Sequence, residues 1–234
     1  MKTLIFATNN KQKLQEVREM VADKIEIKSL SDVGLEGDIP ETADTLEGNA
    51  LQKARWVWER IENSKFKIRS SSSRASAENL KLKIRSSSSR ASADNSVEAD
   101  EVVGVFADDT GLEVEALDGR PGVYSARYAG EHCTFDDNIN KMLKEMEGKT
   151  NRKACFRTVI CLIENGEPRY FEGRVDGTIL TERYGKEGFG YDPIFMPDRF
   201  AVSFAEMPLE VKNRISHRGR AVREFINFLV NCDT

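Results

Sequence analysis

The chain has 234 residues, of which 35 are Lys or Arg and 39 are Asp or Glu, giving a net charge of −4. Hydrophobic residues make up 39% and charged residues 32%, a balance that suits a soluble globular protein and excludes fibrous and collagen-like classes. The apolar runs are too short for a membrane span of roughly 18–20 residues or a signal-peptide core of about 7–15, so we expect neither.

The N-terminal segment has the order of a phosphate-binding loop. Residues 2–7 predict a strand, and the following helix presents one apolar side, made of Leu14, Val17, Met20 and Val21. The turn between them consists of Thr8, Asn9, Asn10, Lys11, Gln12 and Lys13. Backbone N–H groups at a helix start face an anionic ligand, and Lys13 lies one turn inside the helix, where its ammonium can meet phosphate oxygens. The turn lacks the P-loop pattern GxxxxGK(S/T), and simple helix capping is the alternative interpretation.

A second amphipathic helix and a serine-rich duplication follow a polar segment that ends near residue 44. The apolar side of this helix is Ala50, Leu51, Ala54, Val57, Trp58 and Ile61. Residues 67–79 and 83–95 are the same sequence apart from one Glu/Asp exchange, within an insert at about 63–101. This composition buries too little apolar surface to offset its ordering entropy, so we expect a flexible surface loop interrupting a single domain over 1–234. The favoured interpretation is a duplication that a surface loop tolerates. The alternatives are phosphorylation by a kinase at Ser76 and Ser92, or contact of the Arg/Ser pattern with RNA.

Two adjacent acids follow the next strand. Residues 102–107 predict a strand that ends at Asp108 and Asp109, where open α/β sheets bind ligands. Two like charges side by side repel unless a cation lies between them, and hard oxygen ligands suit Mg²⁺. Glu41 is a distant candidate partner, and such a carboxylate could orient or deprotonate an attacking water. The alternative interpretation is that both acids lie in a solvent-exposed turn and bind nothing.

The second half of the chain alternates between helix and strand. Residues 112–130 predict a looped region, and Thr134 with Asp137 resembles a capping box before a helix over 135–146. Residues 155–163 and 169–175 predict two strands joined by a hairpin turn. These elements give an α/β class with a mixed sheet. The four cysteines, Cys133, Cys155, Cys161 and Cys232, form no CxxC pair, which is typical of reduced thiols in a cytoplasmic protein.

Two further clusters suit recognition of a flat, polar ligand. The first contains Gly188, Phe189, Gly190, Tyr191 and Asp192. Its glycines let the backbone approach a flat ligand, and Phe189 offers a stacking face. The second is Ser216-His217-Arg218 at a helix start, with Lys212 four residues earlier than Ser216. Donor side chains recognise a carbonyl and reject an amino group, since an unmatched buried polar group costs on the order of 1–3 kcal/mol.

Five motifs in order resemble those of the inosine/xanthosine triphosphate pyrophosphatase family, which removes deaminated purine nucleotides from the NTP pool. The motifs are Thr8-x-Asn10-x-x-Lys13, Ala107-Asp108-Asp109-Thr110-Gly111-Leu112, Pro121-Gly122-Val123-Tyr124-Ser125-Ala126-Arg127-Tyr128, Gly188-Phe189-Gly190-Tyr191-Asp192-Pro193 and Ile215-Ser216-His217-Arg218-Gly219. The resemblance spans residues 1–62 and about 102–230. It implies two α/β lobes around a long mixed sheet with the active site in the cleft between them, a homodimer, and hydrolysis of NTP to NMP and pyrophosphate with Mg²⁺.

The resemblance also assigns roles to residues of this chain. It implies that residues 8–13 and Lys53 hold the triphosphate, that Glu41 and Asp109 bind the metal, and that Asp109 is the base. It implies further that the substrate is contacted by Thr110 and by residues 189–192, Lys212, His217 and Arg218.

Two departures and two alternatives remain open. Asn9 stands where the family commonly has glycine, which predicts a strained or left-handed residue, and the insert at 63–101 could crowd the cleft. A related septum-site pyrophosphatase acting on modified pyrimidine nucleotides is one alternative, although Ser216-His217-Arg218 argues against it. A nucleotide-binding or RNA-linked module without catalysis is the other. We expect no membrane association and no stable nucleic-acid complex.

Overall fold

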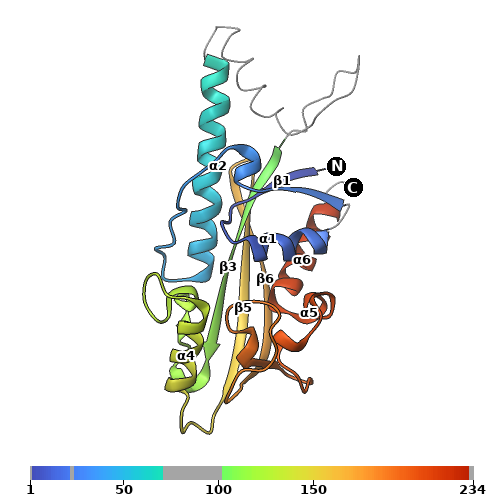
Figure 1. Ribbon diagram of the computed structural model, residues 1–234. Coiled ribbons are helices and arrows are strands. Elements are labelled where there is room, and N and C mark those ends of the chain that lie inside the picture. Colours follow the sequence, from blue (N-terminus) through green and yellow to red (C-terminus); the bar gives the residue numbers. More distant parts are fainter. Residues whose placement is uncertain (1, 22–23, 71–101, 232–234) are drawn as a thin grey trace.

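The computed structural model of the chain describes residues 2–21, 24–70 and 102–231 (Figure 1). Within these ranges the strands form a seven-stranded sheet in the order β2-β1-β3-β5-β6-β7, with β4 paired to β3. The strands are β1 (Lys2–Phe6), β2 (Ile25–Lys28), β3 (Val102–Val114), β4 (Pro121–Gly122), β5 (Lys153–Glu164), β6 (Glu167–Ile179) and β7 (Phe195–Pro197). The α-helices are α1 (Lys11–Val21), α2 (Leu46–Ser70), α4 (Phe135–Glu145), α5 (Leu209–Ile215) and α6 (His217–Asn231).

The sheet is mixed, as the sequence predicted. Strand β1 runs parallel to β2 and β3, whereas β5 is antiparallel to β3 and β6, and β7 is antiparallel to β6. The predicted hairpin is β5–β6, which turns at Asn165 and Gly166, both with positive φ. Such a two-residue turn matches the twist of its flanking strands, so their pairing continues up to the turn. Both strands therefore extend beyond the predicted ranges 155–163 and 169–175.

Helices cover both faces of the sheet (Figure 1). Helices α1 and α6 pack on one face around Phe6, Phe106 and Phe225, and the Phe6 and Phe106 rings stack with centroids 4.5 Å apart. Helix α2 packs on the other face, where its fully buried Ala54 and Val57 belong to one core cluster with strand residues of β1, β3 and β5. A third cluster lies at the far end of the long strands, under α4. These layers fix the N-terminal turns of α1 and α6 beside the middle of β3.

Strand β3 is longer than the sequence predicted. It does not end at residue 107, because Asp108 and Asp109 continue the ladder opposite Ile160 and Val159 of β5. Carboxylates are poor strand formers, but cationic side chains from the helices neutralise both, as described below. The looped region expected over 112–130 therefore begins as strand and also contains β4 and the 3₁₀ turn η4 (Ser125–Arg127).

One other boundary differs from expectation. Helix α2 continues through Ser70, so residues 63–70 of the predicted insert are helical, and the rest of the insert, 71–101, lies outside the described residues. The predicted helix over 135–146 is confirmed as α4, and its N-terminus carries the capping box of Thr134 and Asp137. Among the described residues, no helix combines the length and apolar character that a membrane crossing requires.

Candidate active site

A cavity of about 290 Å³ opens between the first turn of α1, helix α2 and the middle of β3 on one side, and η4, α4 and the α5–α6 junction on the other. It brings together residues from all four predicted clusters. The predicted residues that line it are Thr8, Asn9, Asn10, Lys13, Glu41, Lys53, Asp109, Thr110, Phe189, Gly190, Tyr191, Asp192, Lys212, His217 and Arg218. Lys11, Gln12 and Asp108 are not among the lining residues.

The turn between β1 and α1 is held by its own side chains. Asn10 caps α1, because its Oδ1 accepts the backbone N–H groups of Gln12 and Lys13 at 2.9 and 3.1 Å. The capping interpretation is therefore correct, and two N–H groups at this helix start are already used. Asn9 is absent from the described residues with positive φ, so the expected left-handed residue is wrong; its Nδ2 instead donates to the carbonyl of Gly37 at 3.3 Å. Lys13 is therefore the stronger phosphate candidate in this turn.

The two adjacent acids of β3 point to opposite faces of the sheet, because successive side chains of a strand alternate. Asp108 faces α1 and α6, where Lys13 Nζ lies 3.0 Å from its Oδ1 and Arg218 Nε lies 3.2 Å from its Oδ2. Asp109 faces α2 and lines the cavity, with Lys53 Nζ 3.1 Å from its Oδ1. The two acids thus serve separate cations instead of sharing one, contrary to the expectation of a cation between them.

Asp109 is the centre of a polar group on the α2 side. Lys53 Nζ touches Asp109 and also lies 2.5 Å from Glu41 Oε1, so both carboxylates converge on one cationic centre. Asn49, which is fully buried, donates from Nδ2 to the other oxygen of Asp109 at 3.0 Å. Arg127 reaches from η4 to the Glu41 carbonyl at 3.3 Å. Burial acts to lower the pKa of Lys53, but Asp109 and Glu41 outweigh it and raise the pKa, so Lys53 stays charged.

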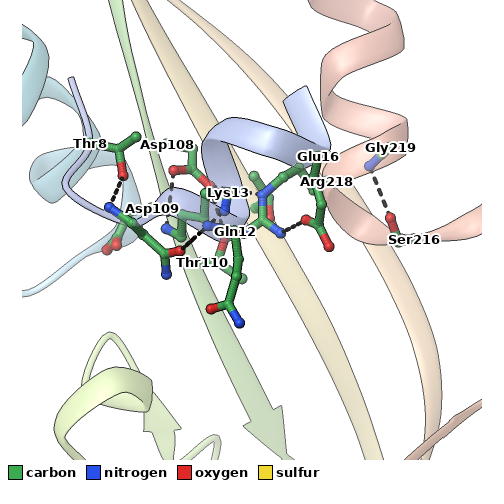
Figure 2. A network of polar contacts seen from close by, with 12 residues as sticks. Thr8, Gln12, Lys13, Glu16, Asp108, Asp109, Thr110, Ser216, Arg218 and Gly219 are labelled. Atoms are coloured by element: carbon green, nitrogen blue, oxygen red, sulfur yellow. Dashed lines mark hydrogen bonds and ion pairs between the residues drawn. The ribbon is translucent and has the colours of Figure 1, made fainter. Parts of the chain in front are cut away.

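On the other side of β3, five charged side chains form a continuous network, of which Figure 2 labels Lys13, Asp108, Arg218 and Glu16. Lys13 pairs with Asp108, Asp108 with Arg218, and Arg218 with Glu16. Glu16 then accepts from Lys212 at 2.9 Å through its second oxygen. Burial would raise the pKa values of Glu16 and Asp108, but the neighbouring cations outweigh it and lower both. The network therefore ties helix α1 to Lys212 and Arg218, which the family resemblance assigns to substrate binding.

The glycine-aromatic turn is closed by Asp192. Its Oδ2 accepts the backbone N–H of Phe189 at 2.8 Å and the ammonium of Lys212 at 2.7 Å. Gly188 has a φ of +75°, and a Cβ there would lie 2.1 Å from Asp192 Oδ2, so only glycine fits this turn. Lys212 Nζ and Arg218 Cζ lie 5.0 and 5.5 Å from the centre of the Phe189 ring. Donor groups and an aromatic face thus meet at one place.

His217 is buried at the start of α6 and lines the same cavity. Ser216 caps this helix at the start that the sequence predicted, because its Oγ accepts the Gly219 N–H at 3.1 Å. The imidazole stacks on Phe156, with ring centroids 4.6 Å apart. Burial, followed by the charges of Arg218 and Lys212, holds its pKa well below the usual value, so it is neutral at pH 7. Its Nδ1 is a buried atom with no hydrogen-bond partner among the described residues, and a ligand in the cavity could provide one.

Sequence reasoning missed Glu16 and Asn49. Both are polar residues on amphipathic helices, with 4% and 0% of their surface exposed. One signal was available for Glu16: it lies three residues after Lys13 and four before the apolar Met20, which places it on the same side of the helix as both. Asn49 directly precedes the apolar run of its helix, but nothing in the sequence pairs it with Asp109.

Comparison with known proteins identifies close relatives over nearly the whole chain. The sequence model of the Ham1 family matches residues 4–228. A protein of Porphyromonas gingivalis named dITP/XTP pyrophosphatase is 45% identical over 98% of each chain. A protein of the same name from Flavobacterium psychrophilum is 43% identical, over 97% of this chain and 99% of the relative.

Solved structures agree with these matches. A HAM1 protein from Coxiella burnetii superposes with a TM-score of 0.74 and 31% identity, covering 99% of this chain and all of the other. The Staphylococcus aureus Ham1 protein gives a TM-score of 0.71 and 32% identity, over 98% and 99% of the two chains. The α/β fold around a mixed sheet is therefore shared with these proteins.

Proposed function

This chain belongs to the Ham1 family, and from that premise we propose that it hydrolyses non-standard purine nucleoside triphosphates, namely ITP, dITP and XTP, to the monophosphate and pyrophosphate. Relatives that match nearly the full chain are named dITP/XTP pyrophosphatases. One observation supports the assignment above the others: Asp109 with Lys53, and His217 with Arg218, line a single cavity. A nucleotide could thus meet a phosphate site and a base site together.

The triphosphate is held, in this proposal, by Lys13 and Lys53. Both ammonium groups line the cavity, one at the start of α1 and the other on α2. Burial lowers the pKa of Lys13, and an incoming phosphate would replace lost water and favour the charged form. The lining contains four Lys or Arg residues against three Asp or Glu residues. Because a triphosphate carries several negative charges, this small excess favours a substrate that enters with a divalent cation.

Glu41 and Asp109 are the residues that would hold Mg²⁺. Their oxygens lie on either side of the Lys53 ammonium, at 2.5 and 3.1 Å from its Nζ, so Mg²⁺ binding at both carboxylates would shift this ammonium toward the phosphates. No group of three or more His, Cys, Asp or Glu within the described ranges could hold a metal ion, and Mg²⁺ often takes only one or two carboxylates, with waters and substrate phosphates completing its shell. When bound, Mg²⁺ would offset phosphate charge and make water a better nucleophile.

Asp109 is the proposed base. A carboxylate offers about four acceptor positions, and Lys53 and Asn49 each take one while fixing the direction of the carboxylate. A water held by Asp109 would give it a proton as the new O–P bond forms, and pyrophosphate would leave. Phosphoryl transfer depends mainly on positioning and charge neutralisation, which these buried partners of Asp109 provide.

Base selection rests on the donors beside Phe189. Hypoxanthine and xanthine present a 6-oxo acceptor, to which Arg218 and the neutral His217 can donate, and an N1–H, which Asp192 or a nearby backbone carbonyl can accept. Adenine inverts both features, and each unmatched buried group costs on the order of 1–3 kcal/mol. That range corresponds to a discrimination of about 5- to 150-fold per contact.

The same proposal covers the setting in which the protein works. Removing deaminated purines from the nucleotide pool keeps them out of DNA and RNA, and this role would place the protein in the cytoplasm. A homodimer is part of the proposal, as the family resemblance implies. No stable complex with nucleic acid is needed for the reaction.

A panel of nucleoside triphosphates with Mg²⁺ tests the function, with separation of NMP plus pyrophosphate from NDP plus orthophosphate. We expect pyrophosphate release from ITP, dITP and XTP far above that from ATP and modified UTP derivatives. Preference for a modified pyrimidine nucleotide would favour the septum-site alternative. Binding of ITP without any product would favour a module that lacks catalysis.

A further inference from the structure

Phe135 is a second aromatic side chain at the cavity, and the proposed function gives it no role. It is the first residue of α4 and lines the same cavity as Phe189. The centroids of the two rings lie 6.1 Å apart, with their planes tilted by 40°. Phe135 is nevertheless 44% exposed. A large apolar side chain that stays half in solvent beside a ligand cavity has surface available for a ligand to cover.

The backbone that carries Phe135 is fixed on both sides. The capping box of Thr134 and Asp137 defines the start of α4, with the Thr134 N–H bonded to Asp137 Oδ2 at 2.8 Å. Arg183, on the segment that leads to the Gly188 turn, donates to Asn140 Oδ1 of α4 at 2.9 Å. The ring of Phe135 can therefore change rotamer while its Cα keeps its place relative to Phe189.

The geometry of the ring pair suits entry of a flat base. Carbon atoms in contact lie about 3.5–4.0 Å apart, so a base between two rings needs centroids about 7 Å apart or slightly more. The present 6.1 Å is short of this by about 1 Å. An exposed side chain changes rotamer within picoseconds to nanoseconds, so a small rotation of Phe135 would open the gap. The donors Lys212 and Arg218 already lie at the Phe189 ring.

We propose that Phe135 is a substrate-contacting residue, whose ring packs on the purine as a second aromatic partner beside Phe189 and is contributed by α4 from across the cavity. This inference rests on the proposed function. Stacking depends on ring area and not on the group at carbon six. Phe135 therefore strengthens binding of ITP and ATP by the same factor, whereas Arg218 and His217 separate the two. Its effect falls on the base and not on the phosphates.

Phe135→Ala and Phe135→Leu test the proposal, with Tyr170→Ala as the matched control. Tyr170 is 45% exposed, lies on β6 and does not line the cavity. The first readout is the Kd of ITP, measured by calorimetry under conditions in which ITP is not hydrolysed. The second is KM and kcat for ITP and for ATP. The third is inhibition by inorganic tripolyphosphate, which has no base. We expect Phe135→Ala to weaken ITP binding and raise both KM values about tenfold. The kcat should stay within about twofold, Leu should lie between Ala and wild type, and Tyr170→Ala should match wild type.

Each remaining outcome is also decisive. An unchanged Kd for ITP in Phe135→Ala would make this ring a surface residue and overturn the inference. Equal weakening of tripolyphosphate inhibition would place its effect on the fold or the phosphates, which also overturns it. If wild-type protein bound ITP but released no pyrophosphate, the proposed function would fail, and a weaker Kd in Phe135→Ala would still support the base contact.

Discussion

Replacing Glu16 by glutamine removes the negative charge that holds two buried cations, Lys212 and Arg218 (Figure 2 shows the pair with Arg218). One Glu16 oxygen accepts from Lys212 at 2.9 Å, and the other accepts from Arg218. The Lys212 side chain is 3% exposed, that of Glu16 5% and that of Arg218 2%. Glutamine has nearly the same shape, but its amide nitrogen would direct N–H groups at a cation.

The expected cost follows from burial. Breaking a buried ion pair by neutralising one partner typically costs about 3–5 kcal/mol, because the remaining charge stays buried without compensation. Arg218 keeps Asp108, and Lys212 keeps Asp192, so we expect the lower part of this range. Against a typical free energy of unfolding of about 5–15 kcal/mol, Glu16→Gln should be clearly destabilised.

Urea unfolding at pH 7 measures this cost, with Glu210→Gln as the control. Glu210 pairs with Arg214 one turn away on α5, but both side chains are more than 70% exposed, so its loss should leave the midpoint almost unchanged. We expect a lower midpoint with the same m-value for Glu16→Gln, together with a higher KM for ITP. A cost below about 1 kcal/mol would mean that the network does not hold Lys212 and Arg218, and the reasoning would be wrong.

Three further predictions concern catalysis, selectivity and pH. Asp109→Asn should nearly abolish pyrophosphate release from ITP while the protein keeps its fold by circular dichroism; near-wild-type turnover would remove the base and metal assignment. Arg218→Ala should raise KM for ITP and narrow its advantage over ATP about tenfold; unchanged selectivity in steady-state kinetics would place base recognition elsewhere. The pKa values of Asp108 and Glu16 are lowered in the folded state, because cations outweigh burial. Their stabilisation is therefore complete above the unfolded values of about 4 and is lost as pH falls below them. The Tm of wild type should fall more steeply between about pH 5 and 3 than that of Glu16→Gln; equal slopes would contradict this.

The parts of the site that the sequence predicted depend on local geometry. The turn before α1 is a run of polar residues between an apolar strand and an amphipathic helix, and its cap forms within the turn itself. The turn around Phe189 needs glycine at position 188 for its backbone, so its residue types reveal it. The helix start at Ser216 is local as well, because the Ser216 Oγ accepts the N–H of Gly219 three residues later. Short-range constraints of this kind leave a direct record in the sequence.

The parts that the sequence did not predict depend on distant partners. Glu16 meets Lys212 and Arg218 across about 200 positions of the chain, and no periodicity encodes such a pairing. The sequence predicts a strand that ends at Asp108 and Asp109, because its apolar run stops there. The structure keeps them in β3 because alternation sends each to a different face, where helices supply cations.

A crystal structure of Asp109→Asn with ITP and Mg²⁺ would show whether one cavity holds both ends of the nucleotide, since this variant should bind without turnover. We predict the hypoxanthine ring at Phe189, with its 6-oxo group within hydrogen-bond distance of Arg218 or His217, and the triphosphate at Lys13 and Lys53. Density for the base outside this cavity, or for the phosphates away from both lysines, would contradict this prediction.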